Sequence, residues 1–189
     1  MSLIIEDITC VEIAKIIADK NIVALFQGQS EAGHRALGNR SILYDPRDPN
    51  GKDYVNIVKQ REGFRPFAAS VMLEVAHDWF DMAGLKESTY MMYALDVIKD
   101  KSKLIPCVCH VDNTCRAQTV THLQNPYFYN LISAFNNLTN VPMLFNTSFN
   151  LAGEVIVETE LDAIDVLKRS KIEYLYLPEK QQLIIEKNI

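Results

Sequence analysis

The sequence is poor in the features that mark secreted and membrane-spanning proteins. Its 189 residues include only four cysteines, too few and too clustered for an extracellular disulfide framework. No apolar run approaches the roughly 18 residues that a transmembrane helix needs. The first seven residues lack the basic end and long apolar run of a secretory signal. We therefore expect a cytoplasmic protein with reduced thiols.

Positive charge is also scarce, with 19 Lys and Arg against 24 Asp and Glu and a net charge of -5. This balance argues against a protein that binds long nucleic acids through their phosphates. The cations are unevenly distributed, because residues 34–65 hold seven of them and only four of the carboxylates. A compact basic region in an acidic chain favours a small polyanion as the ligand.

The composition, 48% apolar and 23% charged, is that of a globular protein, and we expect residues 1–189 to form one α/β domain. Thr9 and Thr159 each begin a capping box, which predicts a helix after each of them. The predicted helices cover residues 10–20, 54–59, 126–138 and 161–170. The predicted strands cover residues 22–26, 67–73, 90–97, 107–111, 117–120, 142–145, 172–177 and 183–186.

Two segments combine arginine with glycine. Residues 31–41 read EAGHRALGNRS, and residues 59–67 read KQREGFRPF. Glycine lets backbone N–H groups approach a ligand, and arginine can bind phosphate oxygens through two hydrogen bonds. Neighbouring like charges are unfavourable unless an anion lies between them. The alternative is a solvated surface, on which these cations pair with nearby carboxylates such as Glu31, Asp45 and Glu62.

A third segment, residues 107–120, contains three of the cysteines and His110. His110 and Asp112 would share one face of a strand, so the carboxylate could orient the imidazole. A zinc site is not expected, because the spacing matches no common zinc pattern and strand alternation turns His110 away from Cys107 and Cys109.

The fourth segment, LFNTSFNLAGE at residues 144–154, places polar side chains directly after a short apolar strand. Ligands commonly bind at that end of a strand in an α/β sheet, although a turn that only ends the strand would have the same composition. The sequence contains no nucleophile elbow, P-loop lysine motif or dinucleotide glycine fingerprint.

Together and in this order, the four segments resemble the C-terminal part of the O-carbamoyltransferase family, whose members carbamoylate hydroxyl groups of antibiotics and nodulation factors. The shared stretches are RALGNRSIL, KQREGFRPFA, HVDNTCRAQTV and NTSFNLAGE, and the resemblance covers about residues 22–177. His34, beside Arg35, stands where the family usually has proline.

The resemblance implies a YrdC-like fold, a twisted mixed sheet with helices and a basic concave face. It also implies that the domain binds carbamoyl phosphate and ATP with Mg²⁺, and forms carbamoyl adenylate. The fixed cations would neutralise the charge that develops during adenylyl transfer. Residue by residue, it implies catalytic roles for Lys59, Arg65, Arg116 and Ser148. The implied substrate and nucleotide ligands are Arg35, Arg61, His110, Asp112, Asn146, Thr147 and Asn150.

Family members also carry a large N-terminal domain of Kae1-like fold, which binds metal and transfers the carbamoyl group to its acceptor. The 189 residues leave no room for that domain, so transfer would need a missing domain or a partner subunit. Two alternatives stay open: a noncatalytic subunit that binds nucleotide or another anion, and a YrdC-type protein that makes threonylcarbamoyl adenylate or binds RNA.

Overall fold

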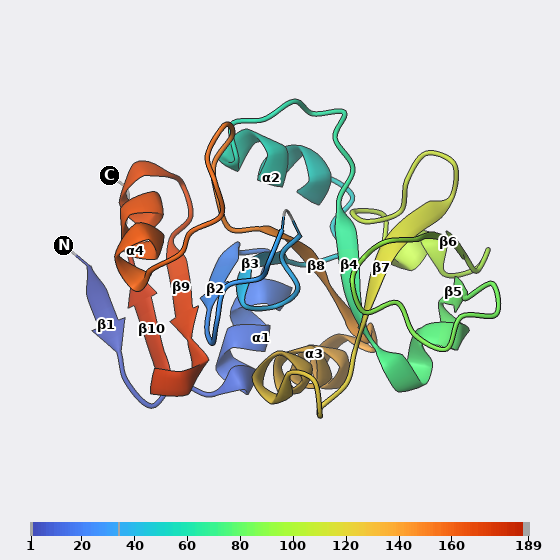
Figure 1. Ribbon diagram of the computed structural model, residues 1–189, viewed down its shortest axis with the longest axis horizontal. Helices are drawn as coiled ribbons and strands as arrows, with labels where there is room; N and C mark the ends of the chain where they lie inside the picture. Colours follow the sequence, from blue (N-terminus) through green and yellow to red (C-terminus); the bar gives the residue numbers. More distant parts are fainter. Residues whose placement is uncertain (1, 34, 187–189) are drawn as a thin grey trace.

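The computed structural model describes residues 2–33 and 35–186, whose strands form one twisted mixed sheet (Figure 1). The strand order is β1-β10-β9-β2-β3-β8-β4-β7-β6-β5, and only the β2–β9 and β4–β7 pairs are parallel. The strands are β1 (Leu3–Ile5), β2 (Val23–Phe26), β3 (Arg40–Tyr44), β4 (Ala68–Met72), β5 (Phe80–Asp81), β6 (Ala94–Val97), β7 (Thr114–Val120), β8 (Met143–Ser148), β9 (Tyr174–Leu177) and β10 (Gln182–Ile185).

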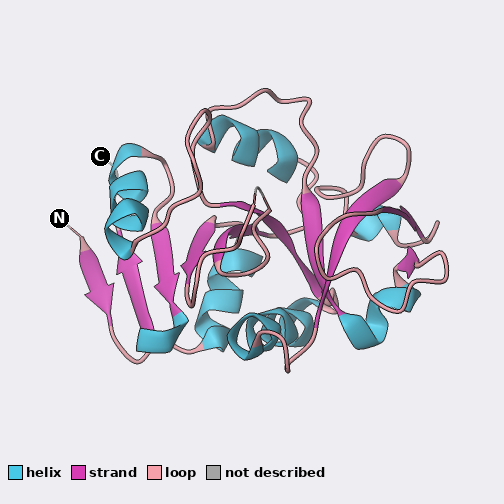
Figure 2. Cartoon of the chain, in the orientation of Figure 1, coloured by secondary structure: helices cyan, strands magenta, loops and turns pink. Residues whose placement is uncertain are grey.

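Four α-helices accompany the sheet in the described part of the chain (Figure 2). They are α1 (Cys10–Ala18), α2 (Gly51–Val58), α3 (Pro126–Thr139) and α4 (Glu160–Arg169). Helices α1 and α3 pack against each other below the central strands in the view of Figure 1, and α2 lies above these strands. None of the helices in residues 2–33 and 35–186 is long and apolar enough to cross a membrane.

The local signals for the helix starts are confirmed. Thr9 and Thr159 each accept a hydrogen bond from the backbone N–H three residues later, and the side chain at that position bonds back to the threonine N–H. Asn125 caps α3 through its side chain alone, which accepts a hydrogen bond from Phe128 N, and Pro126 lies in the first turn. These caps satisfy N–H groups that the helices leave without partners.

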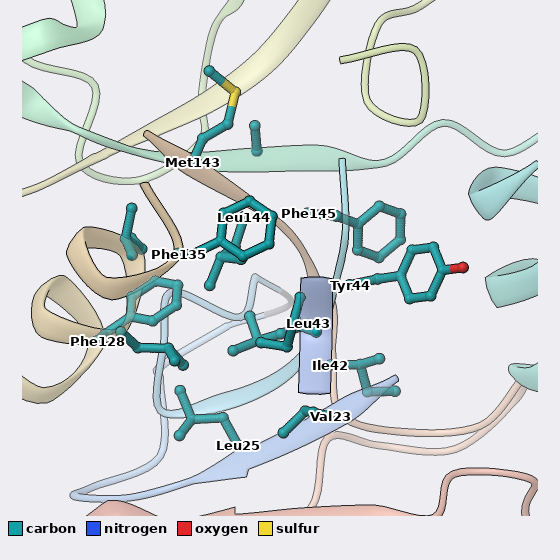
Figure 3. Close-up of a cluster of buried hydrophobic side chains, with 14 of the residues drawn as sticks. Val23, Leu25, Ile42, Leu43, Tyr44, Phe128, Phe135, Met143, Leu144 and Phe145 are labelled. Carbon is teal, nitrogen blue, oxygen red and sulfur yellow. The ribbon is translucent and has the colours of Figure 1, made fainter. Parts of the chain in front are cut away.

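The core lies where α3 meets the central strands (Figure 3). Phe128 and Phe135 of α3 are fully buried against the residues of β2, β3 and β8. The ring of Phe145 packs against Phe67, with the ring centroids 4.4 Å apart. Gly38 is required at this junction, because a Cβ at its position would lie 2.3 Å from the ring of Phe128.

Some of the predicted strands are wrong. Residues 107–111 form a turn, in which Cys109 N donates to Ile105 O. Only residues 94–97 of the predicted strand 90–97 pair with neighbours. Three strands were not predicted: β1, the short β5 and the fully buried β3. Strand β3 begins with the polar residues Arg40 and Ser41, which follow a glycine-containing segment, so the sequence pattern there is typical of a loop.

Candidate anion-binding site

The sheet register places three site positions side by side on strands β8, β4 and β7. Ala68 of β4 pairs with Asn146 on one side and with Arg116 on the other. Directly paired residues point to the same face of a sheet, so the small Ala68 leaves open space between the two longer side chains. This space is part of a cavity of about 270 Å³, whose arginines are Arg35, Arg61, Arg65 and Arg116. We call it the arginine cavity.

Arg35 and Arg116 face this cavity without protein partners. The Nε atom of each is buried and has no hydrogen-bond partner among the described residues. Burial, and then the charge of Arg35, lowers the pKa of Arg116 below its ordinary value. Buried donors are normally satisfied, so this pair of guanidinium groups is arranged for an acceptor that the protein itself does not supply.

Arg61 is held rigidly at the wall of the cavity. Its Nε donates to Asn56 Oδ1 at 2.6 Å, and its guanidinium lies 4.0 Å from the centre of the Phe67 ring. Burial lowers the pKa of Arg61 to about 10, and the charges of Arg65 and Arg116 add to the effect. Several cations therefore repel one another here, and a bound anion would relieve that repulsion.

Arg65 lies farther out, and it has a carboxylate partner. Its Nε is 2.8 Å from Glu62, and both side chains are about half exposed. Exposed pairs of this kind contribute little stability, so Arg65 can exchange Glu62 for a more highly charged anion. The solvated pairing considered from the sequence thus applies to Arg65, whereas Arg47 pairs at 2.6 Å with Asp45, which is buried.

Lys59 is buried, and its ammonium group is fully used within the protein. It donates to the backbone oxygens of Ser148 and Asn150 and, at 3.0 Å, to Asn150 Oδ1. Burial lowers the pKa of Lys59 to about 7, with a smaller effect from Arg61. Lys59 therefore fixes the turn that follows β8, and it lines a neighbouring cavity of about 600 Å³ with Arg61 and Arg65.

Ser148 lies where three cavities adjoin. It lines the arginine cavity, the Lys59 cavity and a third space of about 370 Å³ beside residues 154–158. Its hydroxyl donates to Asn150 Oδ1 at 2.7 Å. Thr147 also lines the arginine cavity. An elongated anion could therefore extend past Ser148 from one cavity into another.

Asn146 is 1% exposed and belongs to a buried amide network. Its Nδ2 donates to Ala36 O at 3.2 Å and to Ser70 Oγ at 2.9 Å, whereas its Oδ1 has no partner. Gln118, which the sequence motifs did not single out, accepts a bond from Ser70 and donates to Leu37 O. This network ties β8, β4 and β7 to the loop that carries Arg35.

His110 and Asp112 do not line the arginine cavity. The predicted bond between them is replaced by two bonds to Thr114, because residues 110–113 form a turn rather than a strand. His110 Nε2 is 3.0 Å from Phe67 O, so the imidazole supports the cavity wall. The described residues contain no group of three or more His, Cys, Asp or Glu that could hold a metal ion. His34 lies outside the described residues.

Glu31 and Arg40 shape the loop above the cavity, roles that the sequence motifs did not reveal. Glu31 Oε1 accepts hydrogen bonds from Leu37 N and Asn39 N at 2.8 and 2.7 Å. Arg40 is 3% exposed, and its Nε, like those of Arg35 and Arg116, has no partner among the described residues. Its two terminal nitrogens, however, donate to backbone oxygens, including Gly28 O and Glu158 O. Unlike the arginines of the cavity, Arg40 is a structural cross-link between two loops.

Comparison with known proteins identifies the family of the chain. The family model of the carbamoyltransferase C-terminus matches residues 14–186, and the chain belongs to this family. Nodulation protein NolNO of Sinorhizobium fredii is 46% identical over 153 residues, which are 80% of this chain and 22% of that protein. The 3'-hydroxymethylcephem-O-carbamoyltransferase of Amycolatopsis lactamdurans is 37% identical over 157 residues, covering 81% of this chain and 29% of that enzyme.

The chain spans between about a fifth and a third of the length of the curated relatives it matches. Among solved structures, HypF in its phosphate- and nucleotide-bound form has a TM-score of 0.62 at 16% identity, over 89% of this chain and 27% of that one. Sua5 of P. abyssi in complex with L-threonine also scores 0.62, at 13% identity, over 92% and 47% of the two chains. The shared fold is thus the YrdC-like one that the sequence predicted.

Proposed function

We propose that the chain binds carbamoyl phosphate and ATP and forms carbamoyl adenylate, the first half of ATP-dependent O-carbamoyl transfer. The observation that carries the proposal is the arginine cavity, where Arg35 Nε, Arg116 Nε and Asn146 Oδ1 are buried without partners. Both substrates are anions rich in acceptor oxygens, and family membership favours a carbamoyl donor. Mg²⁺ would enter with ATP.

The proposed reaction balances if one water is consumed. Water cleaves carbamoyl phosphate to carbamate and phosphate. A carbamate oxygen then attacks the α-phosphorus of ATP, the bond from that phosphorus to the bridging oxygen breaks, and pyrophosphate leaves with the electron pair. Negative charge grows on the phosphoryl oxygens during the attack, and Arg61, Arg65 and Arg116 would stabilise it.

The residues around the turn after β8 would position the substrates. Ser148 and Thr147 present hydroxyl groups at the junction of the cavities, and Lys59 fixes the backbone that carries them. Asn150 links the two, since its Oδ1 accepts bonds from both Lys59 and Ser148. Carbamoyl transfer to a final hydroxyl group would take place in a further domain or partner of Kae1-like fold, in the cytoplasm.

The test measures pyrophosphate release from ATP by the 189-residue chain with and without carbamoyl phosphate. We expect release to depend on carbamoyl phosphate and to fall at least about tenfold in Arg61→Ala and Arg116→Ala. Lys180→Ala is the matched control, because it removes a positive charge from an exposed pair with Glu160 outside the cavity.

Other results would favour the alternatives. Nucleotide binding without turnover, even with a Kae1-like partner, would indicate a noncatalytic subunit. ATP consumption that requires threonine and bicarbonate would indicate a threonylcarbamoyl-adenylate enzyme of the YrdC type.

A further inference from the structure

The orientation of the Asn146 side-chain amide is determined by its neighbours. Ala36 O and Gln118 Oε1 lie on the Nδ2 side, at 3.2 and 3.4 Å, and both are acceptors. The side-chain amide of Gln118 cannot be flipped either, because its Nε2 donates to Leu37 O at 2.8 Å. The atom that Asn146 leaves without a partner is therefore an acceptor, Oδ1.

A buried acceptor beside buried donors selects a particular kind of ligand. Arg35 Nε and Arg116 Nε lack an acceptor, while Asn146 Oδ1 lacks a donor, and all three residues line the arginine cavity. An ionised carboxylate, or a phosphoryl ester that has lost both protons, offers only acceptors. A carbamoyl group offers both kinds of atom, since its oxygens can accept from the arginines and its NH₂ can donate to Asn146.

Met91 is the apolar side chain that limits this cavity from the loop before β6. It is 3% exposed and lines the arginine cavity, yet it does not belong to the hydrophobic core cluster. Its neighbours Tyr90 and Met92 are 67% and 71% exposed. Met91 has a φ of 53°, a left-handed conformation that is unfavourable for its side chain. The loop thus directs only this one of the three residues inward.

The loop is fixed to β7 on both sides of Met91. Ser88 donates to Thr119 Oγ1 and Ala117 O, both at 2.8 Å. Ala94, which begins β6, pairs directly with Arg116. With anchors three residues away in each direction, Met91 is held beside Arg116 and has little freedom to withdraw.

We infer that Asn146 and Met91 make the cavity specific for an unsubstituted carbamoyl group. Asn146 Oδ1 accepts a hydrogen bond from the carbamoyl NH₂, and Met91 occupies the space that a substituent on that nitrogen would need. This inference rests on the proposed function, because it assigns the part of the cavity that holds the carbamoyl group.

The first experiment compares binding of carbamoyl phosphate, acetyl phosphate and inorganic phosphate by calorimetry. Acetyl phosphate has nearly the same shape but carries a methyl group in place of the NH₂. We expect it to bind about tenfold or more weakly, because Asn146 Oδ1 would stay unpaired. Equal affinity for carbamoyl and acetyl phosphate would overturn the role of Asn146.

The second experiment measures ATP–pyrophosphate exchange supported by bicarbonate with ammonium, which forms carbamate, or with methylamine, which forms N-methylcarbamate. We expect the wild-type chain to prefer carbamate by about tenfold. Met91→Ala should reduce the preference to about twofold, and Met91→Gly, which suits the left-handed backbone, is the second variant. Met92→Ala is the matched control and should keep the wild-type preference.

The outcomes separate this inference from the proposed function. A wild-type chain that uses both carbamates equally, or a preference that survives in both Met91 variants, contradicts the inference. If selective binding of carbamoyl phosphate is measured but pyrophosphate release from ATP does not depend on carbamoyl phosphate, carbamoyl-adenylate formation fails while the binding specificity stands.

Discussion

Arg116→Ala should weaken ligand binding while leaving the free protein nearly as stable as before. In the free chain Arg116 is desolvated, lies near Arg35 and has a buried Nε without a partner. Its removal relieves these costs, so we expect the free energy of unfolding to change by less than about 1 kcal/mol. Carbamoyl phosphate should lose a charge-assisted hydrogen bond of about 1.5–3 kcal/mol, which weakens binding about tenfold to 150-fold.

Arg40→Ala is the contrasting variant, because Arg40 is also desolvated but its terminal guanidinium nitrogens are hydrogen-bonded within the protein. It donates to four backbone oxygens and lies 3.7 Å from the centre of the Phe26 ring. Its loss should cost about 2–4 kcal/mol of unfolding free energy. Urea unfolding and calorimetry measure both quantities. If Arg116→Ala loses stability as Arg40→Ala does and still binds carbamoyl phosphate with wild-type affinity, the reasoning is refuted.

Three further predictions concern the surroundings of the cavity. Burial lowers the pKa of Lys59 from 10.5 to about 7, so between these pH values the folded state binds fewer protons than the unfolded state. The free energy of unfolding of the wild type should therefore rise from pH 7 to 9 relative to that of Lys59→Met, by up to about 1.4 kcal/mol per pH unit. Gly38→Ala should lower the unfolding free energy by about 2 kcal/mol or more, since the added Cβ meets Phe128 at a φ of 108°. Burial raises the pKa of Cys115 to about 12 and that of Cys107 as well, so thiol reagents should label both only upon unfolding.

Each of these predictions has a result that contradicts it. Parallel pH profiles for the wild type and Lys59→Met would show that Lys59 titrates alike in both states. A Gly38→Ala variant of wild-type stability would show that Phe128 has room to move. Rapid labelling of Cys107 in the folded chain, at the rate of the partly exposed Cys10, would contradict its burial.

The helices were predictable because their signals are local. A capping threonine and an apolar face identify α1 and α4 without reference to the rest of the chain. The failures are positions where tertiary structure overrides local preference. Residues 107–111 have the β-branched and small residues of a strand, but the backbone N–H groups of residues 107–109 bond to Pro46 and Ile105, and that of His110 closes a turn on Thr114.

The arginines of the site were also predictable, since their clustering and the family motifs pointed to one region. The sequence could not show which cations are free. Arg116 and Arg40 are the same residue type in the sequence. In the structure, however, Arg116 Nε has no partner, whereas Arg40 donates to four backbone carbonyl groups. No sequence pattern indicated that Met91 belongs to the cavity, because its loop is placed against Arg116 only by the register of β6 with β7.

The most direct measurement of the central claim follows oxygen-18 from the carbonyl oxygen of carbamoyl phosphate during incubation with ATP. If a carbamate oxygen attacks the α-phosphorus, AMP recovered after breakdown of the adenylate carries the label, and Arg116→Ala reduces that labelled AMP in parallel with pyrophosphate release. AMP that gains oxygen only from the solvent would show that water attacks ATP directly, and carbamoyl adenylate would then not be the product of this cavity.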